Sequence, residues 1–406
     1  MSFVSKKFEI DPKSELRIQL DLNQNVEVKI EGDAEVFGNE LAMTQKFHFS
    51  QFAIFSWSGA KVTLNGEFKS AFASDSSIPM YTNIHEKLEE RRLLARRDHL
   101  DGPRILIVGR QDSGKTTLAK VLLGYAVREC ETPVYIDMEL ERGDTCLPGA
   151  ITITSLNKMN TIPFYYGWTT PNENYTYFCS LVQDINNTIN SLCEHKSKVR
   201  SSGIVINGGN WPIENPELLK DVITLLNVDC VLVIDQERLY NQIKEYNIEN
   251  LQVSKLRGSN GTESRGNERF LNERNWNINK YFYGIPVEGI TFQPVTKWFQ
   301  YNELNIYHYP DQKEVKRSAN LYTETAQVDN MKITPISVPI TSALNQYILA
   351  VTNAQSVDEL LHSSIYGFVY ILRVNEETQE VQLSLPFTGD LPGHYLIMGT
   401  TTWDAK

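Results

Sequence analysis

The sequence predicts an α/β protein in which a central parallel sheet, with helices on both faces, is flanked by an N-terminal β-sandwich and a C-terminal β-rich domain. Two observations predict this class. Between residues 104 and 235, nearly continuous apolar runs alternate with longer helical segments, as in buried parallel strands joined by helices. Before and after this region, short segments alternate apolar and polar residues, which is typical of half-buried strands. The predicted domains are residues 1–97, 98–289 and 290–406.

The N-terminal part alternates apolar and polar positions with turn-forming residues between the runs. This period of two predicts a small β-sandwich. A charged stretch at residues 83–97 follows and carries Ile84, Leu88 and Leu94 on a polar background, which predicts a linker helix packed on one side. The predicted N-terminal strands include residues 16–22, 26–30, 52–55 and 62–64.

The central part contains the longest apolar strands and the clearest helical periodicity. Helices are predicted from Leu118 onward and at residues 175–192 and 216–227, since their apolar residues recur at spacings of three and four. The predicted central strands are residues 104–109, 133–140, 203–208 and 230–235. The predicted C-terminal strands are residues 291–292, 306–307, 348–351, 368–372 and 381–385.

The composition is that of an ordinary globular protein and excludes several classes. The chain has 406 residues, of which 41% are hydrophobic and 22% charged, and it lacks an apolar run long enough to cross a membrane. We therefore expect a soluble, intracellular protein without a membrane partner. The net charge of −11 argues against a protein that coats nucleic acid non-specifically. The five cysteines show no CxxC spacing, which favours reduced thiols.

Residues 104–117, RILIVGRQDSGKTT, indicate a phosphate-binding P-loop. The apolar strand enters a G-x-x-x-x-G-K-T loop from Gly109 to Thr116, and a helical segment follows. Such glycines let successive backbone N–H groups turn toward one point, and the helix N-terminus adds positive potential. Lys115 can then bridge the outer phosphates while the Thr116 hydroxyl ligates Mg²⁺. The sequence therefore predicts a P-loop NTPase-type sheet that binds a nucleoside triphosphate, and not an ordinary glycine-containing turn.

Segments spread along nearly the whole chain match one known family. They are ELRIQL (15–20), AEVFGNEL (34–41), GPRILIVGRQDSGKTT (102–117), WTTP (168–171), VINGGNW (205–211), VDCVLVIDQERLYNQIK (228–244), YFYG (281–284) and GFVYILRVNEETQEVQLSLP (367–386). In these segments the chain resembles the eukaryotic polyribonucleotide 5′-hydroxyl kinases of the pre-mRNA 3′-end cleavage factor. The resemblance implies ATP and Mg²⁺ as cofactors and the 5′-hydroxyl end of RNA as substrate. It also implies subunits of the cleavage factor and, in animals, the tRNA splicing endonuclease as partners, and the nucleus as location.

The resemblance also assigns residues to the two ends of the nucleotide. Glu15 matches a residue that contacts the adenine end. Gln51 stands where the family has a basic neighbour of the adenine, so one adenine contact is expected to differ in this chain. Thr116 is the expected metal ligand. The triphosphate is expected on Asp112, Ser113, Gly114, Lys115, Thr116 and Thr117.

Four more residues acquire roles through the resemblance. Thr169 lies in a clasp segment that holds Lys115 in a productive place, and Trp211 matches a tryptophan that stacks on an RNA base near the 5′ end. Arg269 and Arg274 precede YFYG, where the family places lid arginines over the transferring phosphate. Without the resemblance, Thr169 would be a turn residue, Trp211 a core aromatic and the two arginines surface residues.

The chain departs from the family after its second central strand. The family ends this strand in Asp-x-Gly-Gln, whose aspartate accepts the proton of the attacking RNA hydroxyl, whereas this chain has Glu139, Glu141 and Arg142 at the three positions. A glutamate can act as a general base, but a misplacement of ~1 Å can cost ~10²-fold in rate. Asp137 is expected to face the other side of the strand and to be a poor substitute.

Two functions from different classes remain compatible with the sequence. In the first, the protein is an active kinase with Glu139 as base and with Lys115, Arg269 and Arg274 stabilising the transferring phosphoryl group. In the second, it is an ATP-holding scaffold in the 3′-end processing complex. A GTPase-type switch is disfavoured, since no Asn-Lys-x-Asp guanine-reading motif follows the later strands.

Overall fold

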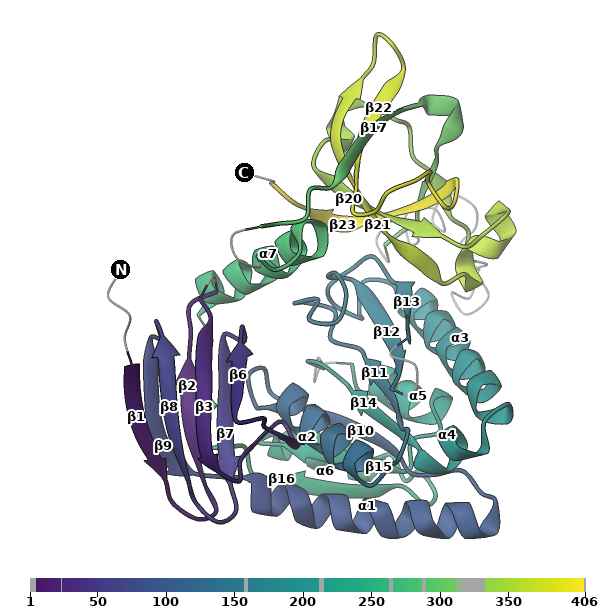
Figure 1. The fold of residues 1–406 in the computed structure, drawn as a ribbon. Helices are drawn as coiled ribbons and strands as arrows, with labels where there is room; N and C mark the ends of the chain where they lie inside the picture. Colours follow the sequence, from purple (N-terminus) through teal and green to yellow (C-terminus); the bar gives the residue numbers. More distant parts are fainter. Residues whose placement is uncertain are drawn as a thin grey trace.

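The computed structural model describes most of the chain and arranges it in three parts that each contain β-structure (Figure 1). In Figure 1 the N-terminal part lies beside the central part, and the C-terminal part lies above both. No helix among the described residues has the length and apolarity needed to cross a bilayer. The described residues are 5–22, 24–156, 160–211, 215–262, 266–286, 290–311, 314 and 333–404.

The N-terminal part is the predicted β-sandwich. Its two sheets have the strand orders β1-β8-β3-β6 and β5-β4-β7-β2-β9, with antiparallel neighbours. Alternate residues of these strands, such as Leu16 and Ile18, enclose a separate apolar core. The strands are β1 Ser5–Ile10, β2 Ser14–Gln19, β3 Val26–Gly32, β4 Glu35–Val36, β5 Asn39–Glu40, β6 Thr44–Phe47, β7 Gln51–Ser56, β8 Ala60–Gly66 and β9 Ser70–Asp75.

The linker helix α1 spans Ile78–Asp98, so it begins five residues before the predicted start at residue 83 and crosses the predicted boundary after residue 97. It runs along the central part, as Figure 1 shows. Leu88 is buried as expected, whereas Leu94 is 50% exposed. The buried face instead includes Arg92, whose Nε donates to the carbonyl oxygen of Ser202 at 3.0 Å.

The central sheet has the order β13-β12-β11-β14-β10-β15-β16. Neighbouring strands are parallel along the series β11, β14, β10, β15 and β16, which confirms the predicted parallel sheet. The antiparallel hairpin of β12 and β13 extends the sheet beyond β11, and this hairpin was not predicted from the sequence. The strands are β10 Arg104–Gly109, β11 Val134–Asp137, β12 Ala150–Ser155, β13 Asn160–Tyr165, β14 Ile204–Asn207, β15 Cys230–Ile234 and β16 Gln252–Leu256.

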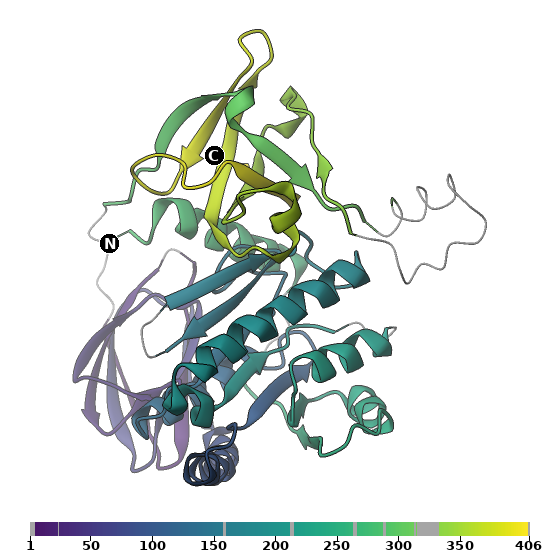
Figure 2. The ribbon, with the colours of Figure 1, turned by 90° about the vertical axis from the view of Figure 1, so that its right-hand side faces the viewer.

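Helices cover both faces of this sheet, as predicted. Ile105 and Ile107 of β10 belong to the core formed with α1 and α2, whereas Leu106 and Val108 belong to the core formed with α3 and α5. In Figure 2 the teal helix α3 crosses the face of the molecule turned toward the viewer. The helices are α2 Lys115–Arg128, α3 Tyr175–Glu194, α4 Ser197–Ser202, α5 Pro216–Leu225 and α6 Glu237–Glu245.

The helix α7, Asn267–Tyr283, connects the central part to the C-terminal sheet. Its Ile278 and Phe282 share a core with Ile348 and Ala350. The alternate residues of β20 face a second core within the C-terminal part. The sheet order is β17-β22-β21-β20-β23-β18-β19, with strands β17 Val295–Gln300, β18 Asn305–His308, β19 Ile336–Ser337, β20 Tyr347–Thr352, β21 Ile365–Asn375, β22 Glu380–Leu385 and β23 Tyr395–Thr402.

The C-terminal strand predictions are confirmed except for the first. Residues 291–292 form no strand, and β17 begins at Val295. Phe292 and Ile290 are exposed, so the apolar character that suggested a strand here is not explained by burial. The predicted boundary after residue 289 falls at residues 287–289, outside the described residues, and stays a prediction.

Candidate nucleotide and phosphoryl-transfer site

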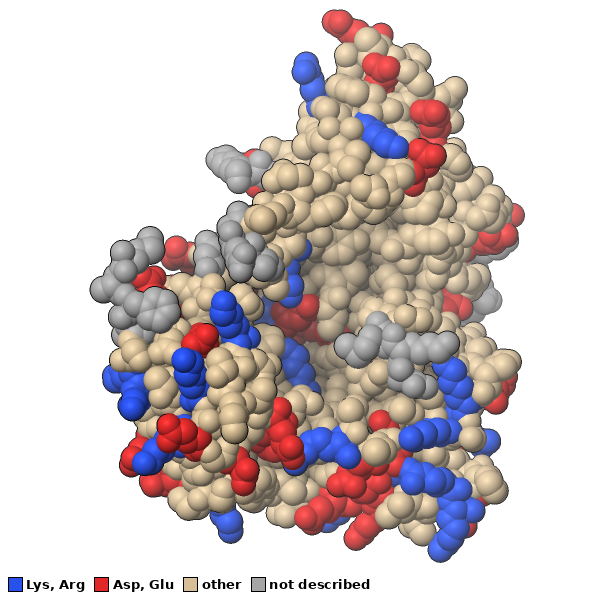
Figure 3. Space-filling model, viewed as in Figure 1, with Lys and Arg blue, Asp and Glu red and all other residues tan. Residues whose placement is uncertain are grey.

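A cavity of about 360 Å³ lies where the sandwich, the P-loop and α7 meet. Figure 3 shows a hollow in this region with both acidic and basic side chains inside it. All six predicted triphosphate-binding residues, Asp112 to Thr117, line the cavity, as do the predicted adenine contacts Glu15 and Gln51. The structure therefore brings together residues that lie as far apart in the sequence as Glu15 and Thr117.

The P-loop turns sharply between β10 and α2. Gly109 packs so closely on β15 that a Cβ atom would lie 2.4 Å from the carbonyl oxygen of Ile234. Gly114 has a φ of 92°, a left-handed conformation that favours glycine, and it caps the start of α2. The first turn of α2 consequently faces the cavity with unsatisfied N–H groups, which is a favourable position for phosphate.

Lys115, the first residue of α2, is 5% exposed. Its Nζ donates to the carbonyl oxygens of Gly109, at 3.3 Å, and Arg110, at 2.7 Å. Burial lowers the pKa of Lys115 to about 8, although the carboxylate of Glu139 acts in the opposite direction. The ammonium group therefore lies within its own loop, surrounded by carbonyl oxygens that a phosphate group can replace.

Thr116 also lines the cavity, and a buried pair of residues positions its side chain. The Nδ2 group of Asn207 donates to Thr116 Oγ1 at 3.2 Å and to Asp137 Oδ1 at 3.0 Å. A hydroxyl oxygen held in this way at a phosphate site fits Mg²⁺, which prefers oxygen ligands and usually binds through one or two protein groups together with phosphates. Thr116 is thus the residue that would hold the ion.

The expectation that Asp137 faces the other side of the strand is wrong. β11 ends at Asp137, and Asp137 Oδ1 accepts hydrogen bonds from the backbone N–H of Glu139 at 3.2 Å and from Asn207 Nδ2 at 3.0 Å, so the carboxylate points toward residues of the site. Asp137 does not line the cavity, but it anchors the Asn207 side chain that contacts Thr116. Asp137 therefore holds Asn207 in place without itself facing the cavity.

Replacing Asp137 by asparagine is expected to change how stability depends on pH. Burial, followed by the nearby Asp144 carboxylate, raises the pKa of Asp137 to about 6. Between its ordinary pKa near 4 and pH 6, the folded protein therefore binds more protons than the unfolded chain, and this carboxyl makes the free energy of unfolding fall as pH rises. The asparagine variant lacks this fall.

Denaturant unfolding at a series of pH values from about 4 to 7 measures the effect. The stability of the asparagine variant relative to the wild type should increase up to about pH 6 and then level off at about 3 kcal/mol above its low-pH value. A stability difference that does not change with pH would contradict the assigned shift.

Glu139 lies immediately after β11 and is 9% exposed. Its Oε1 accepts a hydrogen bond from the backbone N–H of Glu141 at 3.3 Å. Glu139 lines the nucleotide cavity and also a second, much smaller pocket that contains Thr169 and Trp211. Glu139, the residue that takes the place of the family aspartate, therefore lies between the two spaces, and Glu141 lines both of them as well.

Glu141 and Arg142, the other two departures from the family, also line the nucleotide cavity. Burial and the neighbouring Glu139 carboxylate raise the pKa of Glu141. Burial disfavours the charge on Arg142, but the carboxylates of Asp144, Glu139, Glu273 and Asp112 raise its pKa above the ordinary value. Glu141 and Arg142 thus lie in the cavity where the phosphates are predicted to bind.

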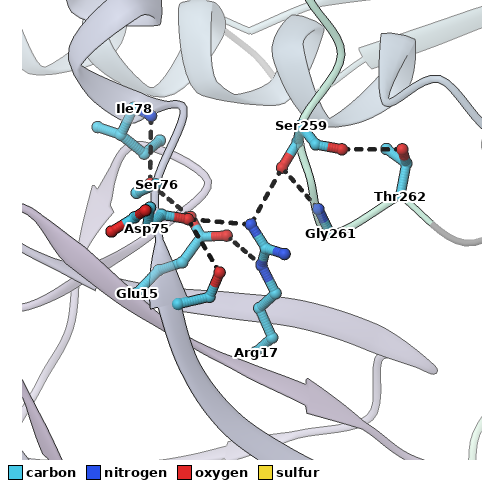
Figure 4. A network of polar contacts seen from close by, with 9 residues as sticks. Glu15, Arg17, Asp75, Ser76, Ile78, Ser259, Gly261 and Thr262 are labelled. Atoms are coloured by element: carbon cyan, nitrogen blue, oxygen red, sulfur yellow. Dashed lines mark hydrogen bonds and ion pairs between the residues drawn. The ribbon is translucent and has the colours of Figure 1, made fainter.

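A polar network around Glu15, where the adenine is predicted to bind, joins two distant parts of the chain (Figure 4). Arg17 Nε donates to Glu15 Oε1 at 2.7 Å, and Ser76 Oγ donates to the other Glu15 oxygen. Arg17 Nη2 donates to the carbonyl oxygen of Asp75 at 3.0 Å and lies 3.4 Å from the Ser259 hydroxyl. Gly261 packs on the guanidinium, since a Cβ atom there would lie 2.5 Å from Arg17 Cζ.

The second pocket contains the predicted clasp and RNA-binding residues. Trp211 is 5% exposed and packs edge-on against Phe178, with ring centroids 6.1 Å apart. Its Nε1 is buried without a hydrogen-bond partner among the described residues. Thr169 is half-buried in the same pocket. The roles of both residues stay predictions.

Replacing Trp211 separates a stacking role from a core role. If the indole stacks on a base, the alanine variant should raise KM for RNA about 5- to 150-fold, since base stacking contributes ~1–3 kcal/mol, and KM for ATP should not change. The phenylalanine variant keeps an aromatic face and should show a smaller increase. Steady-state kinetics with varied RNA and a parallel unfolding curve measure both effects. Lost stability with an unchanged KM for RNA would show a core aromatic.

The two predicted lid arginines lie on α7, but neither lines the cavity. Arg269 Nε forms an ion pair with Glu273 Oε1 at 3.2 Å, and Arg274 Nη2 lies 3.4 Å from the Thr401 hydroxyl of β23. The α7 residues that do line the cavity are Phe270, Glu273, Trp276, Asn277 and Lys280. A role over the phosphate for Arg269 and Arg274 remains a prediction.

Several residues of the site were missed from the sequence. Arg17 and Asn207 occur inside the matching segments ELRIQL and VINGGNW, so the resemblance gave a signal that was not used. Lys120 is one turn beyond the P-loop motif, on the same face of α2 as Thr116, and lines the cavity. Asn277 and Lys280 carried no sequence signal, because their side chains reach the site only through the position of α7.

The fold and the site together define a P-loop nucleotide-binding protein with an acidic residue beside the phosphate site. Family models match nearly the whole chain: "N-terminal beta-sandwich domain of polyadenylation factor" at residues 9–95, "mRNA cleavage and polyadenylation factor CLP1 P-loop" at 109–284, and "Pre-mRNA cleavage complex II protein Clp1" at 292–404. The chain belongs to the Clp1 family.

Individual relatives agree with this assignment. The protein CLP1 homolog of Arabidopsis thaliana is 30% identical, over 98% of this chain and 94% of the relative. The polyribonucleotide 5′-hydroxyl-kinase Clp1 of Homo sapiens is 29% identical, over 97% of this chain and 95% of the relative. A solved structure of Clp1p in complex with Pcf11p has a TM-score of 0.82 and 22% identity, with 98% of each chain covered, and it shows the same fold.

Proposed function

We propose that this protein transfers the γ-phosphoryl group of ATP to the 5′-hydroxyl group of RNA. The observation that carries the proposal is the position of Glu139 between the P-loop cavity and the pocket of Thr169 and Trp211. A general base for this reaction needs the phosphate on one side and the RNA end on the other. Several relatives are named polyribonucleotide 5′-hydroxyl-kinases, which supports the same reaction.

In the proposed reaction, the carboxylate of Glu139 accepts the proton of the RNA 5′-hydroxyl group. The 5′-oxygen forms a bond to the γ-phosphorus, and the bond from that phosphorus to the β,γ-bridging oxygen breaks, so that ADP leaves with the electron pair. Lys115 turns from the carbonyl oxygens of Gly109 and Arg110 to the phosphates and offsets the negative charge. Positioning and charge stabilisation supply most of the rate.

The remaining predicted residues complete this proposal. Thr116 would hold Mg²⁺, which would supply positive charge to offset that of the phosphates. Glu15 and Gln51 bind the adenine end, where their side chains line the cavity. Thr169 fixes the productive lysine position and Trp211 binds the RNA base. Arg269 and Arg274 would reach the phosphate after a movement of α7. The functional divisions are residues 1–97, 98–289 and 290–406.

The family also supports a place for the protein in an assembly. We propose that it acts in the nucleus as a subunit of the pre-mRNA 3′-end cleavage complex, with the tRNA splicing endonuclease as a further partner. The solved neighbours contain Clp1p bound to Pcf11p, and one of them concerns ATP loss in a point mutant. A scaffold that holds ATP without transferring it is the second candidate. The substitutions that introduce Glu139 and Glu141 beside the phosphates favour it.

One experiment separates the two candidates. Purified protein is incubated with γ-labelled ATP and a 5′-hydroxyl RNA, with a 5′-phosphorylated RNA of the same sequence as control. A kinase labels only the 5′-hydroxyl RNA, and the Lys115→Ala variant does not label it. Retention of nucleotide by the wild type without label transfer would overturn the kinase and leave the scaffold.

A further inference from the structure

We propose that Arg142 binds the phosphoryl group during its transfer, and so is a catalytic residue that this chain has in place of the family glutamine. This inference rests on the proposed function. Four observations carry it: the fixed loop that presents Arg142, the position of its side chain in the cavity, the cations that it joins there, and the acidic change that accompanies it.

The loop after β11 holds the backbone of Arg142 in place. The backbone N–H of Gly149 donates to the carbonyl oxygen of Leu140 at 2.8 Å. Gly143 has a φ of 70°, and a Cβ atom there would lie 2.7 Å from the backbone nitrogen of Pro148. The same turn is therefore difficult to form with any other residue at position 143.

Helix α7 fixes the loop from the other side. Asn277 Nδ2 donates to the carbonyl oxygen of Arg142 at 3.2 Å and to Asp144 Oδ1 at 3.1 Å. Asn277 lines the cavity together with Arg142. The position of Arg142 consequently depends on the position of α7, the helix on which the predicted lid arginines lie.

The side chain of Arg142 is 15% exposed and lines the nucleotide cavity with Lys115 and Thr116. Its Nη2 atom lies 3.4 Å from Asp144 Oδ2. A guanidinium group has five N–H donors in a planar fork, and one ion pair of this length engages a small part of that capacity. Two oxygens of one phosphoryl group match the fork better than a single carboxylate oxygen at this distance.

Arg142 shares the cavity wall with two other cations, Lys115 and Lys120. Carboxylates also line this cavity, among them Glu139 and Glu141. A multiply charged anion that binds among the three cations would be stabilised by all of them. The triphosphate would supply that anion.

The sequence change at position 141 shows why a cation is needed here. Glu141 takes the place of a family glycine and adds a negative charge beside Glu139 and the phosphates. With a neutral glutamine at position 142, Lys115 and Arg274 would be left to offset this charge. Arg142 offsets it and presents positive charge to the phosphoryl group, whose negative charge is distributed over its oxygens in the transition state.

The test compares Arg142→Ala, Arg142→Gln and Arg142→Lys with Arg373→Ala, which removes an exposed arginine of β21. ADP with aluminium fluoride serves as the probe of the transferring phosphoryl group, and ADP alone serves as the reference. We expect Arg142→Ala to lower the single-turnover rate about 10²- to 10³-fold, which is the usual cost of removing one preorganised donor from the charge of a transition state. Its affinity for ADP with aluminium fluoride should fall at least tenfold, with little change for ADP.

The other variants keep the test informative. Arg142→Lys keeps the charge without the fork and should recover part of the loss, and Arg142→Gln has the family residue and should remain folded. Arg373→Ala should behave as the wild type. Unchanged rate and unchanged affinity for ADP with aluminium fluoride in Arg142→Ala would overturn the proposal. So would an effect confined to KM for RNA, which would place the guanidinium on the acceptor strand.

Failure of the proposed function would look different. If the wild type transfers no phosphate to RNA but binds ADP with aluminium fluoride more tightly than ADP, and Arg142→Ala loses this difference, the kinase assignment fails while the phosphoryl contact of Arg142 stands.

Discussion

Replacing Glu139 by glutamine is expected to lower the rate of phosphoryl transfer about 10²- to 10⁴-fold, which is the usual contribution of a positioned general base. Glutamine has nearly the same shape but cannot accept the proton of the RNA hydroxyl. Glu139 is buried on the wall between the nucleotide cavity and the pocket of Trp211, so water cannot easily take its place. Single-turnover transfer from γ-labelled ATP, with KM for ATP measured in parallel, gives the result.

Glu139→Asp is the matched control, because it restores the family residue. It should retain much more activity than Glu139→Gln, although its carboxylate lies one carbon–carbon bond farther from the RNA hydroxyl in a site shaped for glutamate. Transfer by Glu139→Gln at the wild-type rate would show that another group is the base. Asp137, which is hydrogen-bonded to the backbone of Glu139, would then be the next residue to test.

Replacing Lys115 by methionine is expected to lower the transfer rate by about 10³-fold or more, because the cation offsets charge on the phosphates as they react. The same change should make the nucleotide-free protein more stable. Burial lowers the pKa of Lys115 to about 8, so the charged form is disfavoured in the folded state and stability rises with pH between about 8 and the ordinary lysine pKa near 10.5.

Denaturant unfolding at pH 7 measures this second effect, which should reach up to about 3 kcal/mol in favour of Lys115→Met. The wild type should also gain stability as the pH rises above 8, and the variant should lack that gain. A variant that is both inactive and less stable at pH 7 would contradict this explanation. In that case the hydrogen bonds to Gly109 and Arg110 would outweigh the cost of burying the charge.

The central sheet could be predicted because both of its faces are buried. Ile105 to Val108 form a continuous apolar run, and each of these four side chains is fully buried against helices. The hairpin β12–β13 was missed because it lies at the edge of the sheet, where Thr152, Thr154 and Thr161 weaken the apolar pattern. Leu94 was assigned to the buried face of α1, but Arg92 and His85 occupy that face.

The part of the site whose residues lie in one short segment could be predicted from the sequence. The P-loop is such a segment, since its glycines, Lys115 and Thr116 are adjacent in the sequence and act through the local turn. Arg17, Asn277 and Lys280 reach the same cavity from other parts of the chain. Their contribution depends on how the sandwich and α7 pack on the central part, and no local pattern records that packing.

The contact between Arg17 and Ser259 has a consequence for how this protein can change in evolution. Positions 17, 259 and 261 form one unit, because a side chain at position 261 would collide with the guanidinium and a shorter residue at position 17 would release both Glu15 and the segment before α7. Substitutions at these positions should therefore covary among descendants of this chain. Loss of the sandwich, or its exchange for an unrelated domain, would remove Glu15, Arg17 and Gln51 from the wall of the nucleotide cavity.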